Sequence, residues 1–150
     1  MRVVIQRTKS ASVSIDGKIN GEISKGLLIL LGIEPSDTTD DASWLVKKAA
    51  MLRVFDDDEG VMNKSVIDID GEVMVVSQFT LMASYKKGNR PSYIHAAGPE
   101  IAIPLYEFFC KEMEETIKKP VKTGVFGANM QVGLVNDGPV TICMDSKRKE

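Results

Sequence analysis

The sequence predicts an α+β fold in which an antiparallel, hairpin-rich β-sheet forms a barrel-like core and carries two main helices. Three observations predict this class. Short β-rich runs fill both ends of the chain, Asp-Gly pairs separate several of them, and two longer segments change to a helical period. With 150 residues the chain has the size of one ordinary domain, so residues 1–150 are taken as a single domain.

The first third of the chain predicts a meander of four strands. The β-rich runs cover Val3–Thr8, Ala11–Ile15 and Lys18–Ile23, and Asp16-Gly17 between the second and third is a strong hairpin signal. Gly26–Ile33 is a continuous apolar run, which predicts a strand that is buried on both faces.

The middle of the chain predicts one helix and a second hairpin. Residues 35–51 change to an apolar spacing of about three and a half residues, after a start rich in Asp and Thr that can cap a helix. The acidic run at residues 56–60 predicts a turn. Ser65–Ile69 and Glu72–Phe79 are β-rich and flank Asp70-Gly71, so they predict the two strands of a hairpin.

A long loop opens the last part of the chain. Residues 82–98 have no sustained period, and loops of this length are usually functional. The apolar spacing from Glu100 to Ile117 predicts the second helix, with Pro104 tolerated if it lies in the first turn. The final β-rich runs are Val121–Val125, Ala128–Val135 and Val140–Met144, the last two joined by a turn at Asn136–Pro139.

Composition and charge limit the possible functions. No apolar run is long enough to span a membrane and the first residues lack the layout of a signal peptide, so we expect a cytoplasmic protein with no membrane partner. Cys110 and Cys143 lie far apart without a CxxC motif or a nearby His, which predicts reduced core cysteines and no metal site. No Gly-rich phosphate loop is present, so no nucleotide cofactor is predicted.

The net charge of −2 gives no general attraction for nucleic acid, but the charge is unevenly distributed. Lys86, Lys87 and Arg90 form a short basic stretch within the long loop. Such a stretch can contact a polyanion even on an acidic protein. The alternative is an ordinary solvated loop.

The sequence lacks a conventional catalytic set. Its single histidine, His95, would have to reach Ser77 or Thr80 to act as a base for a nucleophile. That arrangement, an esterase of wider substrate range, stays open as one alternative. A lone histidine in a loop is more often a surface residue without a catalytic role.

The strand that ends at Ser77–Thr80 is one candidate site. A strand that stops there leaves backbone N–H groups unpaired beyond the sheet, and such groups can stabilise an oxyanion without any charged side chain. The alternative is that the two hydroxyl residues only cap the end of the strand.

The segment Asn136–Thr141 is the other candidate site. Gly138 followed by Pro139 removes a Cβ and an N–H at adjacent positions, so that carbonyl groups are the strong backbone features of the pair. An X-Pro bond is also the one place where a cis peptide is readily accessible, although a trans bond in an ordinary hairpin turn is the alternative.

Taken together, these two stretches resemble the paired signature of the D-aminoacyl-tRNA deacylases. The resemblance is carried by SQFTL at Ser77–Leu81 and NDGPVT at Asn136–Thr141. The segments MRVVIQR, KGLLILLGI, LRVF, KKGNRPSY and FGANMQV also look like their counterparts in that family, in the same order. The resemblance spans nearly the whole chain, and both motifs at this separation are highly specific.

The resemblance implies the fold of that family and a homodimeric hydrolase without cofactor or metal. Such an enzyme cleaves the ester between a D-amino acid and the 3′ end of tRNA, and it also clears glycine from tRNA for alanine. The residues implied to line the site are Ser77, Gln78, Phe79 and Thr80. Gly138 and Pro139 are implied to form a Gly-cis-Pro element that enters the partner subunit's pocket and rejects an L side chain. The candidates for phosphate contacts, on charge alone, are Lys86, Lys87 and Arg90.

The mechanism implied by the resemblance needs no base from the protein. Main-chain N–H groups near Phe79 and Thr80 would stabilise the tetrahedral oxyanion, and the ribose 2′-hydroxyl of the tRNA would help to activate water. Thr80 as a covalent nucleophile is the second possibility. A non-catalytic tRNA-binding domain of the same fold is the alternative from another class. A relative that acts on L-aminoacyl-tRNA shares SQFTL, but the Gly-Pro pair here is of the D-selective kind.

Overall fold

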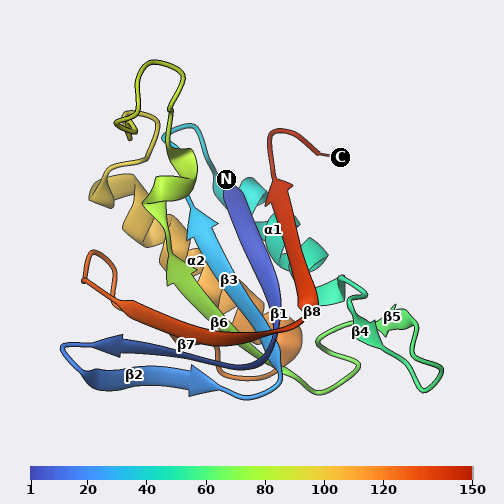
Figure 1. The fold of residues 1–150 in the computed structure, drawn as a ribbon. Coiled ribbons are helices and arrows are strands. Elements are labelled where there is room, and N and C mark those ends of the chain that lie inside the picture. Colours follow the sequence, from blue (N-terminus) through green and yellow to red (C-terminus); the bar gives the residue numbers. More distant parts are fainter. Residues whose placement is uncertain (150) are drawn as a thin grey trace.

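A computed structural model describes residues 1–149 of the chain and confirms the α+β class with two helices and a barrel-like sheet (Figure 1). The helices are α1 (Thr39–Met51) and α2 (Pro99–Ile117), and a short 3₁₀ turn, η1, covers Phe79–Met82. The strands are β1 (Arg2–Ile15), β2 (Lys18–Ile23), β3 (Gly26–Gly32), β4 (Phe55–Asp56), β5 (Met62–Lys64), β6 (Glu72–Ser77), β7 (Lys122–Thr123) and β8 (Gln131–Asp145).

Two long, bent strands give the sheet its curl. The strand order is β2-β1-β3-β6-β7, and β8 pairs with β1 along almost the whole length of both strands. The first half of β1 pairs with β3 and its second half with β2, so β1 and β8 bend together as they pass from one part of the sheet to the other (Figure 1). The result is a strongly curved sheet with both helices behind one of its faces.

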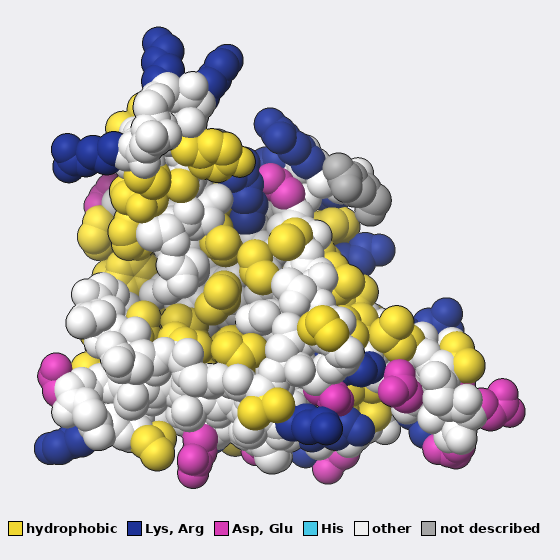
Figure 2. Space-filling view, in the orientation of Figure 1, with side chains coloured by type: hydrophobic (Ala, Val, Ile, Leu, Met, Phe, Trp, Pro, Cys, Tyr) yellow, Lys and Arg dark blue, Asp and Glu magenta, His cyan; other side chains and the backbone are white. Residues whose placement is uncertain are grey.

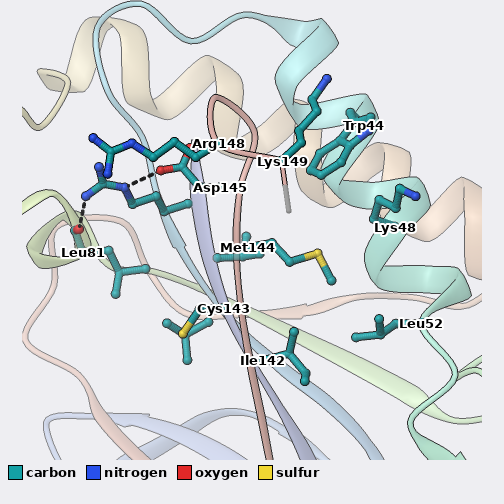
Figure 3. A pocket seen from close by; sticks show the side chains of 13 residues that line it. Trp44, Lys48, Leu52, Leu81, Ile142, Cys143, Met144, Asp145, Arg148 and Lys149 are labelled. Atoms are coloured by element: carbon teal, nitrogen blue, oxygen red, sulfur yellow. Dashed lines mark hydrogen bonds and ion pairs between the residues drawn. The ribbon is translucent and has the colours of Figure 1, made fainter.

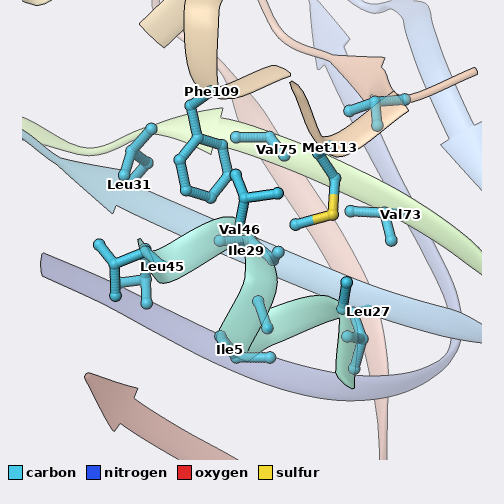
Figure 4. Packing of buried hydrophobic residues seen from close by; sticks show 14 of the residues in the cluster. Ile5, Leu27, Ile29, Leu31, Leu45, Val46, Val73, Val75, Phe109 and Met113 are labelled. Atoms are coloured by element: carbon cyan, nitrogen blue, oxygen red, sulfur yellow. The ribbon is translucent and has the colours of Figure 1, made fainter. Parts of the chain in front are cut away.

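The main core lies between this sheet and the two helices (Figure 4). The side chains that meet there include Leu27, Ile29 and Leu31 of β3, Leu45 and Val46 of α1, and Phe109 and Met113 of α2. The alternate residue Leu28 packs on the other face, in a second cluster with Val13 and Met74. Strand β3 is therefore buried on both faces, as its continuous apolar run predicts.

Several local predictions are confirmed. Asp16 and Gly17 both have positive φ, at 50° and 76°, as the two-residue hairpin turn between β1 and β2 requires. Helix α1 begins after Thr38, whose backbone N–H donates to the carboxylate of Asp41 at 2.9 Å. This capping contact satisfies one of the N–H groups that a helix leaves free at its start.

Other predictions are wrong about how the β-rich runs are connected. Val3–Thr8 and Ala11–Ile15 belong to the single strand β1. Val140–Met144 belongs to β8, and so does the predicted run Ala128–Val135 from Gln131 on, since residues 128–130 lie outside any strand. No turn separates the runs within either strand. The register of the β1–β8 pair shifts there, between Gln6 and Ser10 of β1, because both strands bend at this point. Residues that are typical of turns lie at the bend, which explains why a turn was predicted.

The second predicted hairpin is also wrong. Ser65–Ile69 forms a turn, in which Asp68 accepts hydrogen bonds from the Ser65 N–H and hydroxyl at 2.7 Å each. Strand β6 pairs in parallel with β3 and with β7, so the sheet is mixed and not wholly antiparallel. Pro104 lies in the second turn of α2 and not in the first, because the helix already begins at Pro99.

Within residues 1–149, neither helix is long and apolar enough to cross a bilayer. Both cysteines are free thiols; Cys110 is partly buried, as expected, whereas Cys143 is exposed on β8, so the prediction that it is a core residue is wrong. Burial raises the pKa of the Cys110 thiol to about 12, which keeps it protonated and unreactive.

Candidate active site at the end of β6

The polar strand end lies where β6 leaves the sheet. Ser77 is still in register with Leu31 of β3, and the Gln78 N–H donates to the Leu31 carbonyl at 2.7 Å as the last bond of the ladder. The chain then enters η1, which packs directly on Gly32. A Cβ on Gly32 would lie 2.9 Å from the Leu81 Cβ and 3.1 Å from the Gln78 carbonyl oxygen, so the turn needs a glycine beneath it.

The 3₁₀ turn leaves two backbone N–H groups at its start. The first hydrogen bond of the turn runs from the Leu81 N–H to the Gln78 carbonyl at 3.1 Å. The N–H groups of Phe79 and Thr80 come before this bond in the chain, so the turn itself provides no acceptor for them. No backbone acceptor for either group is found among residues 1–149. Two adjacent N–H groups of this kind can bind a negatively charged oxygen.

The side chains around the turn are fixed by local contacts. The Gln78 amide donates a hydrogen bond to the Thr80 hydroxyl. The Phe79 ring is 55% exposed and meets the Tyr93 ring edge-on, with centroids 5.0 Å apart and an interplanar angle of 75°. The turn therefore presents an exposed aromatic pair next to the two free N–H groups.

A small hollow of about 70 Å³ opens beside the turn, and its polar lining comes from Ser77 and Gln78. The other lining residues are apolar or glycine, and include Leu31, Phe126 and Gly127. Among the described residues, none that lines this hollow titrates near neutral pH. His95 lines a separate hollow with Tyr85 and Lys86 and makes no hydrogen bond with Ser77 or Thr80 in the described part of the chain.

Gly138 and Pro139 lie in the bulge of β8, where Asn136 faces Thr8 and Thr141 faces Gln6 across the strand pair. Their peptide bond is cis, Gly138 has a φ of +134°, and both residues are exposed. A side chain at Gly138 would be strained there, since its Cβ would lie 2.8 Å from the Val140 side chain.

The side chain of Arg7 supports this bulge, although nothing in the sequence indicates a role for Arg7 at a functional site. Its Nε donates to the Asp137 carbonyl at 2.9 Å, and its Nη1 donates to the Val54 carbonyl at 2.6 Å and lies 3.3 Å from Asp56 Oδ1. Arg7 is 8% exposed, so these contacts also satisfy a buried charge. A buried arginine in a strand looks like any exposed strand residue in sequence, which is why it was missed.

The two candidate motifs lie far apart within one chain. The bulge lies opposite Arg7, which pairs with Leu27 of β3, whereas Ser77 pairs with Leu31, four residues further along that strand. This is about 13 Å along the strands, and the three strand spacings from β8 to β6 add about 14 Å across them. One chain therefore cannot bring both motifs to the same small group.

The three predicted phosphate contacts lie together on the long loop. Lys86, Lys87 and Arg90 are all exposed, and the loop is closed by reciprocal backbone hydrogen bonds between Ser84 and Ser92, each 2.8 Å long. Figure 2 shows these basic side chains pointing away from the loop in different directions.

A larger hollow, of about 800 Å³, lies elsewhere, between α1 and the last part of β8 (Figure 3). It borders the 3₁₀ turn through Leu81, whose carbonyl accepts from Arg2 at 3.1 Å. Arg2 also bonds Asp145 at 2.8 Å. Burial raises the pKa of Asp145, but the hydrogen bonds from Arg2 and from the Lys147 N–H outweigh it, so the net pKa is lowered and the pair stays ionised.

Comparisons with known proteins decide which family this arrangement represents. The family model of D-Tyr-tRNA(Tyr) deacylase matches residues 4–145. The chain belongs to the D-Tyr-tRNA(Tyr) deacylase family. It is 60% identical to a D-aminoacyl-tRNA deacylase of Bacteroides thetaiotaomicron and 61% identical to one of Flavobacterium psychrophilum, in both cases over the full length of both chains.

Two solved structures share the fold of this chain. The c-Myc DNA unwinding element binding protein superimposes with a TM-score of 0.92 at 41% identity, covering 97% of this chain and 98% of the other. The structure of a probable eukaryotic D-amino acid tRNA deacylase superimposes with a TM-score of 0.81, over 95% and 97% of the two chains. At 15% identity this second likeness shows the shared fold alone.

Proposed function

We propose that the end of β6 is the catalytic site of this D-aminoacyl-tRNA deacylase and that the site is completed by a second subunit. The enzyme is a hydrolase that cleaves the ester of D-aminoacyl-tRNA. Its full-length relatives at about 60% identity are named D-aminoacyl-tRNA deacylase, which is this activity. The observation that carries the proposed site is the pair of free N–H groups at Phe79 and Thr80, beside a hollow without titratable side chains.

The proposed mechanism uses backbone groups for the charge that develops on the substrate. Water attacks the ester carbonyl, and the N–H groups of Phe79 and Thr80 donate to the oxygen that becomes negative. The ribose 2′-hydroxyl helps to take the proton from water, and the 3′-oxygen of the tRNA leaves with a proton. The products are the free D-amino acid and tRNA.

The chiral choice is proposed to come from the partner subunit. Gly138 and Pro139 are exposed, and within one chain they lie far from the 3₁₀ turn, so they can serve a site of this kind only in a homodimer. Their carbonyls would accept from the substrate's ammonium group and leave no space for an L side chain. Hydrophobic side chains over β1, β3 and β8 lie on the face between the two motifs, which suits a subunit interface (Figure 2).

Further details of the function are part of the same proposal. The whole chain works as one D-aminoacyl-tRNA deacylase domain in the cytoplasm, without a cofactor or metal. Lys86, Lys87 and Arg90 contact tRNA phosphates and position the tRNA without reading its sequence. A site that rejects L side chains by space alone also accepts glycine, so glycyl-tRNA for alanine is a second substrate.

The test compares hydrolysis of one tRNA that carries either D- or L-tyrosine, at low enzyme concentration and fixed salt. We expect the D-ester to react at least about a thousandfold faster, which corresponds to about 4 kcal/mol of rejection. Equal rates would leave a hydrolase without the proposed chiral choice. Binding of the tRNA without hydrolysis would replace the enzyme with the tRNA-binding alternative.

A matched variant tests the esterase alternative. His95→Ala should change the rate with the D-ester less than about threefold, since His95 is not in contact with Ser77 or Thr80. A loss of several hundredfold, together with a trapped acyl-enzyme, would instead identify His95 as a base for a nucleophile.

A further inference from the structure

Two protruding segments of opposite charge lie at opposite ends of the molecule (Figure 1). The acidic arm, residues 55–64, is the β4–β5 hairpin and carries four carboxylates, Asp56, Asp57, Asp58 and Glu59, and one amine, Lys64. The basic loop, residues 84–94, carries Lys86, Lys87 and Arg90 and no carboxylate. Figure 2 shows the acidic side chains over the arm and the basic ones over the loop.

The acidic arm is attached to the Gly138-Pro139 bulge. Arg7 donates to the Asp137 carbonyl at the bulge and to the Val54 carbonyl at the base of the arm, and it pairs with Asp56 in the arm itself. At the tip, Asp57 accepts from the Glu59 and Val61 N–H groups at 3.0 and 2.9 Å. The arm is therefore an ordered structure whose position is fixed relative to the bulge.

The basic loop is attached to the 3₁₀ turn in the same way. The Tyr93 ring packs edge-on against Phe79 of the turn, and the loop closes on itself through the hydrogen bonds between Ser84 and Ser92. The Ala97 N–H donates to the Ile33 carbonyl at 2.9 Å, which holds the end of the loop beside β3. Each candidate motif thus has its own charged protrusion.

A two-fold axis that brings the bulge of one subunit to the turn of the other also relates the two protrusions. Along one face of the molecule the order is arm, bulge, turn, loop (Figure 1). In an isologous dimer the same face of both subunits meets, and the order along one subunit runs opposite to the order along the other. The bulge of each subunit then meets the turn of its partner, and the arm of each meets the partner's loop. We infer that the acidic arm of each subunit lies against the basic loop of its partner and fastens the bulge in the partner's site. This inference rests on the proposed dimeric site.

The surfaces of the two protrusions fit this contact in apolar character as well as in charge. Val61 and Met62 of the arm are 50% and 51% exposed, and Tyr85 and Ile94 of the loop are 78% and 79% exposed. Covering these side chains in an arm–loop contact would remove apolar surface from water, which favours the contact. Because the basic side chains point in different directions, the loop can meet the arm and still offer a cation to a phosphate.

Charge-reversal variants test the contact. Asp58 and Glu59 are the best positions on the arm, since the Asp58 side chain is 99% exposed and neither side chain accepts the backbone bonds that shape the tip. Asp58→Lys with Glu59→Lys gives a basic arm, and Lys86→Glu with Lys87→Glu gives an acidic loop. Each double variant alone should dimerise about tenfold more weakly at low salt, because both contacts of the symmetric dimer become repulsive.

Mixing the two double variants provides the decisive readout. In a mixed dimer the basic arm faces the acidic loop and the acidic arm faces the basic loop, so both contacts are attractive again. In native mass spectrometry of an equimolar mixture, we expect the ratio of mixed dimers to homodimers to be several fold above its statistical value of about one, with the excess lost at high salt.

The outcomes separate this inference from the proposed site. Double variants that dimerise as tightly as the wild type and mix statistically would overturn the arm–loop contact while leaving the dimeric site in place. A wild-type protein that is monomeric and still hydrolyses D-tyrosyl-tRNA would overturn both. If the loop variant loses tRNA binding but dimerises normally, the loop serves the tRNA alone and the inference fails.

Discussion

At the residue scale, the candidate site depends on backbone groups and not on ionisable side chains. The N–H groups of Phe79 and Thr80 are free because a 3₁₀ turn begins there, and the Gln78 and Thr80 side chains bond each other. A site of this kind is hard to predict from residue types, since any residue carries an N–H. The sequence indicated it only through a strand that ends in polar residues and through the resemblance of SQFTL.

Replacing Phe79 by proline removes one of the proposed oxyanion donors. Phe79 is the first residue of the turn, where proline is tolerated. Gln78 before it has φ −142° and ψ 77°, which lies outside the helical region that a following proline disfavours. Phe79→Ala is the control, because both variants lose the ring but only proline loses the N–H. We expect kcat to be about 10²–10³-fold lower in the proline variant than in the alanine variant. Equal rates would mean that the Phe79 N–H is not used.

Thr80→Val tests whether the hydroxyl is a nucleophile. Valine keeps the shape and the backbone N–H, so the rate with the D-ester should fall less than about tenfold if the N–H carries the catalysis. Loss of a covalent nucleophile would lower kcat by at least about 10⁴-fold. Thr80→Ser, which retains a hydroxyl, is the matched control. Single-turnover hydrolysis of D-tyrosyl-tRNA distinguishes the two results.

At the scale of the elements, the period of the sequence predicted most helices and strands but not how they pair. Apolar spacing identified α1, α2 and β3, because helical faces and buried strands are local patterns. The bends of β1 and β8 were predicted as turns, since Asn136–Pro139 has turn-like residues. Parallel pairing of β3 with β6 depends on packing between distant segments, which no local pattern contains.

Gly32→Ala should move the 3₁₀ turn and lower activity. The new Cβ would lie 2.9 Å from the Leu81 Cβ and 3.1 Å from the Gln78 carbonyl oxygen, so the turn has to shift by a few tenths of an ångström. Small displacements of a catalytic group are costly, and we expect kcat to fall at least tenfold. Gly21→Ala is the control, since its Cβ would have no atom closer than 3.4 Å and should change kcat little. Unchanged activity of the Gly32 variant would show that the position of the turn is not critical.

At the scale of the whole molecule, the two ends of the chain meet at the start of α1. The Met1 ammonium group is buried against Asp37, and the Ser146 N–H donates to the Met1 carbonyl at 2.9 Å. Lys147 pairs with Asp41 at 2.8 Å. Burial raises the pKa of Asp41, but hydrogen bonds with Lys147, Ser146 and the Thr38 N–H, together with the Lys147 charge, hold it well below its usual range.

Asp41→Asn should therefore reduce stability in a pH-dependent way. A depressed pKa means that the Asp41 carboxylate stabilises the folded state above the unfolded pKa of 3.8, and that this contribution declines as the pH falls below it. At pH 7 we expect the variant to be less stable by about 1–2 kcal/mol, a modest value because Lys147 is partly exposed. The difference should shrink at pH 3 in urea unfolding curves. Asp40→Asn is the control, since Asp40 lies in the same helical turn but is exposed, and it should show little change at either pH. A difference that stays constant from pH 7 to pH 3 would mean that asparagine changes packing, and that the ion pair does not join the chain ends.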